Sequence, residues 1–235
     1  MPATLTDIER AVSPLGMIVR GGFHPMPADA VPGAESAEAT LVLIGNAGST
    51  MWGPFDRAWP AAQREHERHP LNTWTRAAIS PIAATLGARA LYPMDGPPYL
   101  PFQRWGAKAE GLRQSPLGTL LHPAYGQWHA YRAALVFAYH IALAVPQPTP
   151  DACAECQDKP CLSRCPVTAF RIQGYDVATC VGHLAERSGR NDGDCMDRGC
   201  LARRACPVGR EHVYSPPHAR FHMERFLLSH SDVAG

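Results

Sequence analysis

All eight cysteines of this 235-residue chain lie between Cys153 and Cys206, and the 152 residues before Cys153 contain none. A chain of this length has room for one large and one small domain, so this abrupt change in composition predicts two domains. Pro146, Pro148 and Pro150 form a stiff linker between them. We therefore expect a first domain over residues 1–146, a cysteine-bearing domain over residues 147–215, and a C-terminal helix and tail over residues 216–235.

The charge balance excludes some partners. The chain has 22 basic and 21 acidic residues, so nothing in its net charge points to nucleic acid or to an anionic membrane surface. The first nine residues lack the basic start and apolar run of a signal peptide. The longest apolar stretch, residues 133–145, is shorter than the roughly 20 residues that cross a bilayer. We predict a cytoplasmic protein with no membrane or nucleic-acid partner.

The cysteine-free part has both helical and strand patterns. Apolar residues recur at helical spacing from Leu5 to Leu15, after a capping-box pattern over residues 6–9. Residues 40–44 form a short apolar run that predicts a buried strand ending at Gly45. A second helical pattern covers residues 71–86 and should end at Gly87. Helices that interleave with strands predict an α+β fold for this domain.

The cysteine spacing predicts a metal centre. The cysteines follow the order Cys153-x2-Cys156-x4-Cys161-x3-Cys165-Pro, then Cys180, Cys195, Cys200 and Cys206-Pro. A cubane iron–sulfur cluster takes four thiolates, so two clusters take all eight. The two Cys-Pro steps resemble those of bacterial ferredoxins, electron-transfer proteins with two [4Fe–4S] clusters, in which the fourth cysteine of a run binds the other cluster. On that pattern the first thiol group is Cys153, Cys156, Cys161 and Cys206, and the second thiol group is Cys165, Cys180, Cys195 and Cys200.

Two other readings of the cysteines are weaker. Structural zinc usually pairs two short Cys-x2-Cys knuckles, and only Cys153 and Cys156 form one here. Zinc also gives no reason for the two Cys-Pro steps. A disulfide framework usually serves a chain too small to bury a core, and this chain is not small.

One part of the cysteine segment resembles two families of reductases. The element Asp176-Val177-Ala178-Thr179-Cys180-Val181-Gly182-His183-Leu184 is similar to one in epoxyqueuosine reductases and reductive dehalogenases. In both families this element supplies a cluster ligand from a helix, which the resemblance assigns here to Cys180. In both families the clusters hand electrons to a cobalamin.

The residues before the linker resemble CblC-type cobalamin-processing proteins. The segment from Leu121 to Leu135 is similar to the family's His-Pro-x-aromatic-Gly-x-Trp-x-Ala-x-Arg-Gly segment. The resemblance implies a nitroreductase-like fold without flavin that binds a corrinoid in the vacated cavity. It assigns corrinoid or co-substrate contacts to His122, Tyr125, Trp128, His129 and Arg132. The chain departs from the family at Lys108, where relatives have a histidine.

Taken together, these features predict an iron–sulfur oxidoreductase with two [4Fe–4S] clusters whose first domain binds cobalamin and whose second domain reduces it. An external low-potential donor such as a flavodoxin, a ferredoxin or a reductase would supply the electrons. One alternative is a cobalamin-dependent reductase similar to epoxyqueuosine reductase or reductive dehalogenase. Another is a simple ferredoxin-type electron carrier. All eight cysteines are predicted cluster ligands, so none is left as a catalytic nucleophile. The sequence therefore leaves the catalytic side chains unassigned.

Overall fold

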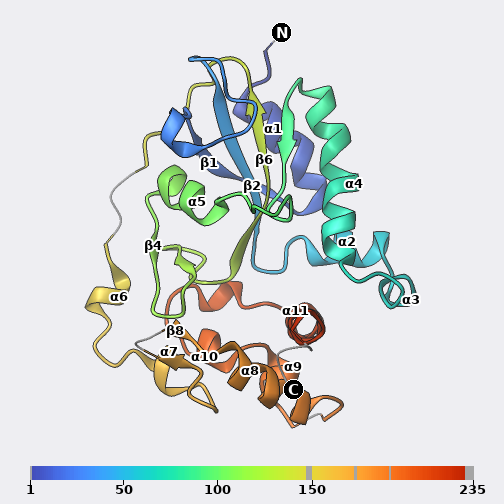
Figure 1. The fold of residues 1–235 in the computed structure, drawn as a ribbon, viewed down its shortest axis with the longest axis vertical. Coiled ribbons are helices and arrows are strands. Elements are labelled where there is room, and N and C mark those ends of the chain that lie inside the picture. The colour runs from blue at the N-terminus through green and yellow to red at the C-terminus, as the bar shows by residue number, and fades with distance from the viewer. Residues whose placement is uncertain (1, 147–149, 172–173, 191, 231–235) are drawn as a thin grey trace. The chain divides into compact units, whose positions relative to one another are not determined.

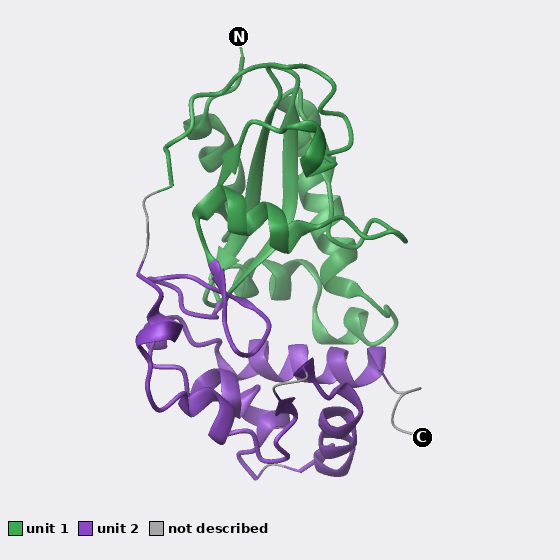
Figure 2. Cartoon of the chain, turned by 60° about the vertical axis from the view of Figure 1, so that its left-hand side comes forward, with its two compact units in different colours: residues 1–112, 129–149 green, residues 113–128, 150–235 purple. Residues whose placement is uncertain are grey.

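The computed structural model describes residues 2–146, 150–171, 174–190 and 192–230. Two compact units make up the chain (Figure 2): unit 1 contains residues 1–112 and 129–149, and unit 2 contains residues 113–128 and 150–235. The predicted domain 1–146 therefore differs from unit 1 in the segment 113–128, which belongs to unit 2. Pro148 of the predicted linker lies outside the described residues.

Unit 1 is built on a four-stranded antiparallel sheet in the order β1-β2-β6-β3 (Figure 1). These strands are β1 (Ile18–Phe23), β2 (Thr40–Ala47), β6 (His129–Phe137) and β3 (Arg89–Leu91). The predicted strand at residues 40–44 is confirmed, but it runs on through Gly45 to Ala47. Every residue of β2 is buried, so both faces of the sheet are covered.

Helices cover this sheet. Those of unit 1 are α1 (Leu5–Val12), α2 (Trp52–Ala58), α3 (Ala61–Arg64), α4 (Pro70–Thr85) and α5 (Phe102–Glu110). Helices α1 and α5 pack on β1, and α4 packs on β3 and β6. The predicted helix at residues 71–86 is confirmed as α4, and Gly87 follows it in the left-handed conformation that glycine adopts without strain. The α+β prediction is thus confirmed for the described residues.

The first helix starts from a different cap than the sequence predicted. Thr4 caps α1: its side chain accepts from the Asp7 backbone, and the Asp7 carboxylate accepts from the Thr4 backbone. The predicted box over residues 6–9 is therefore wrong. Glu9 is occupied elsewhere, because its carboxylate accepts a hydrogen bond from the Val19 backbone at 2.7 Å.

Unit 2 consists of short elements joined by turns. They are β4 (Arg113–Gln114), β5 (Leu120–Leu121), α6 (Ala152–Glu155), α7 (Pro160–Ser163), β7 (Phe170–Arg171), β8 (Gly174–Tyr175), α8 (Val177–Arg187), α9 (Cys195–Arg198), α10 (Leu201–Arg204) and α11 (Pro216–Ser229). Helix α7 packs on α10, and α11 packs on α8 and α9. Cysteines take part in two of its small apolar clusters. Among the described residues of the whole chain, every helix is too short or too polar to cross a membrane.

Candidate functional site

The first thiol group lines one cavity of unit 2. Cys153, Cys156, Cys161 and Cys206 surround it together with residues that include Leu121, Gln127 and Lys159. The thiols are close enough to influence one another. Burial raises the pKa of Cys153 and of Cys161, and the neighbouring Cys206 raises both further.

Three short elements carry these thiols. The Asp151 carboxylate caps α6 by accepting from the backbone of Cys153 at 3.1 Å and of Ala154 at 3.0 Å. Helix α7 carries Cys161 in its first turn, and Cys206 follows the end of α10. Because α7 packs on α10, cysteines that lie far apart in the sequence come together.

The second thiol group is gathered around α8, α9 and the start of α10. Asp176 caps α8, accepting from the Thr179 backbone at 3.0 Å, and this fixes the turn that carries Cys180. Burial raises the pKa of Cys195 to about 12, and nearby Cys200 and Cys180 contribute to the rise. Burial likewise raises the pKa of Cys180, with a contribution from Cys165. The four thiols therefore interact as one group.

Two hydrogen bonds reach sulfur atoms of this group. The backbone N–H of Ala169 donates to Cys165 Sγ at 3.2 Å. The Tyr175 hydroxyl donates to the Cys180 sulfur, so that burial and this bond both raise the pKa of Tyr175. Donors aimed at a sulfur favour its thiolate form, which is the form that binds metals.

The eight thiols suit a metal centre. All eight are free thiols without a disulfide partner. Cys153, Cys156, Cys161 and Cys206 line one cavity, and electrostatic interactions connect Cys165, Cys180, Cys195 and Cys200. Burial and neighbouring thiols raise the pKa of Cys153, Cys161, Cys180 and Cys195, and a positive metal centre removes that penalty by binding the thiolates. Both a [4Fe–4S] cluster and a Cys₄ zinc ion take such a donor set.

A mixed group of side chains beside the second thiol group was missed at the sequence level. Metal-binding atoms of His183, Asp194 and Cys195 all lie within 4.8 Å of one another. His183 Nε2 lies 3.0 Å from Asp194 Oδ2, and both side chains are largely buried. His183 and Asp194 are eleven residues apart, so no spacing motif in the sequence connects them.

His122 and Tyr125, two of the predicted corrinoid contacts, lie in unit 2. The Nδ1 atom of His122 accepts from the backbone of Ala124 at 3.0 Å and of Tyr125 at 3.1 Å, and the two rings stack at 4.1 Å. Gly126, with φ +56°, passes so close to Val208 that an added Cβ would lie 2.1 Å from its carbonyl oxygen. This turn therefore packs directly against the chain that follows Cys206.

Trp128 is also a buried residue of unit 2. It contacts the Tyr214 ring edge to face at 5.3 Å, and the guanidinium of Arg203 lies 4.4 Å from its ring centroid. Its indole Nε1 is buried and has no hydrogen-bond partner among the described residues. His129 belongs to unit 1 instead, where its ring lies 6.0 Å from that of Tyr131. The five predicted contacts are thus divided between the two units.

Arg132, in unit 1, sits at an irregularity of the sheet. Ile44 pairs with Ala133 but Gly45 pairs with Tyr131, which leaves Arg132 as the extra residue of a β-bulge. Bulges re-aim side chains and often occur beside functional sites. Its Nε donates to Asn46 Oδ1 at 3.3 Å, which orients the guanidinium.

A cavity of about 250 Å³ opens beside Arg132. Its wall is formed by α4, the loop after β3, and β6; the lining residues are Asn72, Thr75, Pro93, Met94, Tyr131 and Arg132. Pockets for drug-sized ligands measure about 300–1,000 Å³, so this cavity has room only for a smaller group. An amide, a hydroxyl and a guanidinium in its wall suit an amide or carboxylate group.

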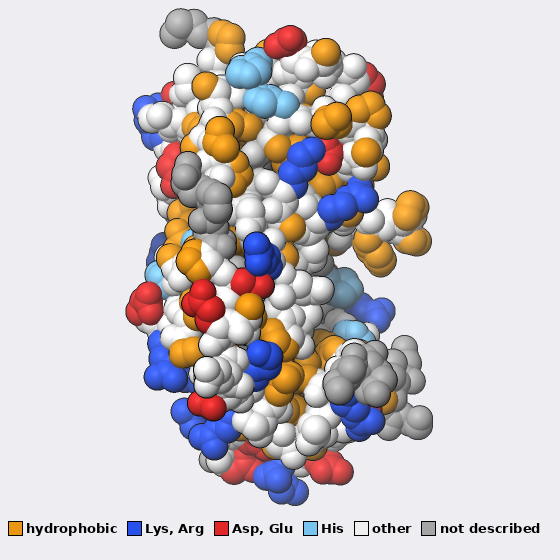
Figure 3. Space-filling model, turned by 90° about the vertical axis from the view of Figure 1, so that its left-hand side faces the viewer, with side chains coloured by type: hydrophobic (Ala, Val, Ile, Leu, Met, Phe, Trp, Pro, Cys, Tyr) orange, Lys and Arg blue, Asp and Glu red, His pale blue; other side chains and the backbone are white. Residues whose placement is uncertain are grey.

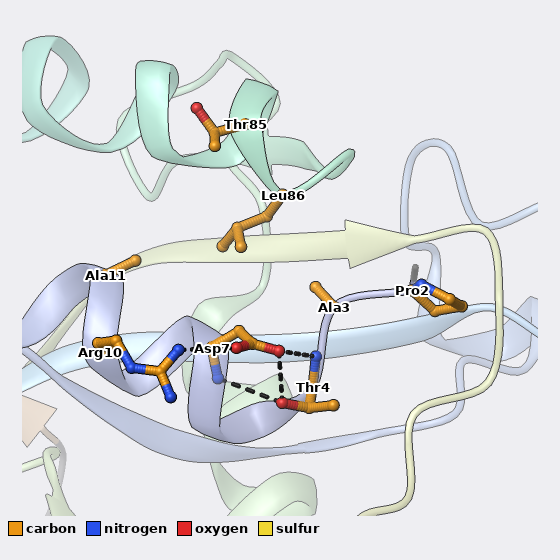
Figure 4. Close-up of a pocket in the computed structure, with 8 residues that line it drawn as sticks. All are labelled: Pro2, Ala3, Thr4, Asp7, Arg10, Ala11, Thr85 and Leu86. Atoms are coloured by element: carbon orange, nitrogen blue, oxygen red, sulfur yellow. Dashed lines mark hydrogen bonds and ion pairs between the residues drawn. The ribbon is translucent and has the colours of Figure 1, made fainter.

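A larger cavity lies elsewhere in unit 1. It measures about 590 Å³ and is open to solvent between the start of α1 and the end of α4 (Figure 4). Its polar side chains mostly bind one another, as in the bonds between Thr4, Asp7 and Arg10. None of the predicted site residues lines it. On the face shown in Figure 3, acidic and basic side chains are interspersed over the surface.

Comparison with solved structures shows a CblC-like fold. A B12-trafficking protein CblC from C. elegans, a homologue of human MMACHC, shares 15% identity over 95% of this chain and 92% of its own, with a TM-score of 0.56. Epoxyqueuosine reductase from Bacillus subtilis has 15% identity over 92% of this chain and 68% of its own, with a TM-score of 0.48. An epoxyqueuosine reductase with a modified tRNA-Tyr stem loop has 12% identity, coverages of 89% and 66%, and a TM-score of 0.44. No protein-family model and no curated protein matches the sequence.

Proposed function

We propose that this protein is an iron–sulfur oxidoreductase in which unit 2 binds two [4Fe–4S] clusters and delivers electrons to a cobalamin held by unit 1. The observation that carries the proposal is the presence of eight free thiols in two groups of four. The CblC-like fold supports a corrinoid as the substrate, because the similar structure is that of a B12-trafficking protein.

Each thiol group would hold one cluster. The first would be bound by Cys153, Cys156, Cys161 and Cys206, and the second by Cys165, Cys180, Cys195 and Cys200. When bound, these clusters supply one-electron transfer at potentials set by net charge, burial and hydrogen bonds to sulfur. The Ala169 amide and the Tyr175 hydroxyl are aimed at sulfurs of the second group and support its thiolate state.

For the corrinoid, Arg132 is the best supported contact. Its bulge position and its bond to Asn46 hold a guanidinium at the wall of the cavity of about 250 Å³. We propose that Arg132 binds a propionamide side chain there. His129 is a further proposed contact within unit 1. His122, Tyr125 and Trp128 were also predicted as contacts, and their packing within unit 2 supports a structural role for them.

The proposed chemistry also points to a setting and a donor. Eight reduced thiols fit a reducing compartment, so we propose a cytoplasmic protein. Electrons would come from an external low-potential donor such as a flavodoxin, a ferredoxin or a reductase.

The test uses anaerobically purified full-length protein. We expect about eight iron and eight acid-labile sulfide per chain, as two cubane clusters require. Mixed with hydroxocobalamin and dithionite, the protein should retain a reduced corrinoid spectrum after desalting. Two zinc ions and no iron would refute the clusters, and free passage of the corrinoid would refute the substrate.

A second candidate function is a cobalamin-dependent reductase similar to epoxyqueuosine reductase. The observation that favours it is α8, which begins at the Asp176 cap and carries Cys180 one turn later, as the resembled element requires. A deletion strain that lacks queuosine in its transfer RNA would support this candidate over cofactor processing. Unchanged queuosine would count against it.

A further inference from the structure

Lys159 lies in the enlarged gap between Cys156 and Cys161 and lines the cavity of the first thiol group. Its ammonium Nζ donates to the carbonyl oxygen of Cys153 at 3.1 Å and to that of Cys156 at 3.0 Å. The side chain therefore ties together the two residues of the Cys-x2-Cys knuckle. Its charge is therefore held, half-buried, at the wall of the cavity that the four thiols line.

The backbone at Lys159 is strained. Its φ of 37° and ψ of 58° are in the left-handed region, which a residue with a side chain seldom adopts. The next residue is Pro160, which further restricts the residue before it. Glycine would meet this backbone demand without strain. A lysine at such a position therefore points to a role for its side chain, because strained backbone tends to persist where function requires it.

Among the described residues that line the cavity, none carries a carboxylate to balance the charge of Lys159. Apart from the four cysteines, Lys159 has the only ionisable side chain among the described residues of this wall. The nearby Asp151, which acts electrostatically on Cys153, is already paired with Arg113 at 3.1 Å. A cluster with four thiolates becomes more negative by one charge when it gains an electron. A fixed cation within a partly buried site favours that reduced form.

We propose that Lys159 is a positioning residue that holds the Cys153–Cys156 knuckle and raises the reduction potential of the cluster bound by the first thiol group. This inference rests on the function proposed above. In the step concerned, one electron passes from the external donor to the cluster, so the donor is oxidised and the cluster is reduced. No covalent bond forms or breaks.

The test is an anaerobic redox titration of full-length holoprotein, followed by electron paramagnetic resonance. Lys159→Met removes both the charge and the donor, Lys159→Gln keeps a donor without the charge, and Lys159→Arg keeps the charge. In the Met and Gln variants, one of the two midpoint potentials should fall by the equivalent of about a tenfold change in equilibrium constant, which is 59 mV for a one-electron couple. The other potential should not move, and the Arg variant should stay near wild type.

A matched control separates this local effect from a change in net charge. Arg190 is an exposed cation of unit 2, so Arg190→Gln should leave both potentials unchanged. Wild-type potentials in Lys159→Gln would overturn the electrostatic role, and an equal shift in Lys159→Arg would do the same. If the Met and Gln variants lose iron, retention of iron by Lys159→Arg supports the proposal and its loss overturns it. Less than eight iron in the wild type refutes the proposed function itself, whereas eight iron with unmoved potentials refutes this inference alone.

Discussion

Arg20 and Glu110 form a two-pronged ion pair inside unit 1, with Arg20 Nε 2.8 Å from Glu110 Oε1 and Nη2 3.0 Å from Oε2. The Arg20 side chain is 1% exposed and that of Glu110 is 12% exposed. The Tyr131 hydroxyl donates to the same carboxylate at 2.5 Å. This network links β1, α5 and β6, and it ends next to Arg132, so it fixes the strand that carries the proposed corrinoid contact.

Replacing Glu110 with glutamine should destabilise unit 1 by about 3 kcal/mol, because a buried guanidinium then loses its counter-charge. The control is Asp56→Asn, which breaks a pair with Arg64 that is half exposed on the Asp56 side and should cost less than about 1 kcal/mol. Urea unfolding monitored by circular dichroism measures both. Equal losses of unfolding free energy in the two variants would show that the buried pair stabilises the protein no more than the exposed one.

The close contact of Gly126 predicts a second stability difference. At Gly126, an alanine would have to adopt a left-handed backbone conformation, with φ +56°, and its Cβ would clash with the Val208 carbonyl. At Gly189, an alanine would also need a left-handed conformation, with φ +79°, but its Cβ would have no atom within 4 Å. Gly189→Ala should cost about 1–2 kcal/mol. Gly126→Ala should cost about 1–3 kcal/mol more, because backbone must move. Similar unfolding midpoints for the two variants would contradict this contact.

The thiol groups predict how iron is lost. Cys206→Ser should remove a ligand from the first thiol group and Cys195→Ser one from the second, so each variant should keep about four of eight iron atoms. Iron and sulfide analysis of anaerobic protein checks this. Ser163→Ala, an exposed change on α7, is the control and should keep all of them. Full iron content in either cysteine variant would remove that residue from its group.

Arg132 predicts a change in corrinoid affinity. Removing its guanidinium with Arg132→Ala should weaken hydroxocobalamin binding about tenfold, or about 1.4 kcal/mol, within the range for a hydrogen bond to a charged group. Asn46→Ala, which frees the guanidinium from its 3.3 Å partner, should have a smaller effect in the same direction. Spectroscopic titration gives both constants, with the exposed Arg57→Ala as control. An unchanged constant in Arg132→Ala would exclude this contact.

The sequence predicted the features that depend on neighbouring residues. The apolar run of β2, the helical spacing of α4 and the left-handed Gly87 are local signals, and the structure contains all three. The predicted start of α1 was wrong because both Thr4 and Thr6 begin a possible capping box. A box from Thr6 needs the Glu9 carboxylate, which instead accepts a hydrogen bond from the distant Val19 backbone.

Contacts between distant residues could not be predicted in the same way. Arg132 and Asn46 are separated by 86 positions, and Arg20 and Glu110 by 90, so no spacing rule connects them. The bulge that isolates Arg132 arises from the pairing of β2 with β6 and leaves no mark in either strand alone. The same limit explains why the segment 113–128 was assigned to the first domain, since its packing partners follow residue 150.

Because unit 2 combines two separate segments of the chain, the two units cannot be separated by a single cut in the sequence. A gene fragment beginning at residue 150 would encode all eight cysteines but would omit Pro116, Leu121 and Gln127 from the wall around the first four, and would leave Gly209 without the turn it touches. Excising unit 2 therefore requires grafting residues 113–128 back, for instance by circular permutation.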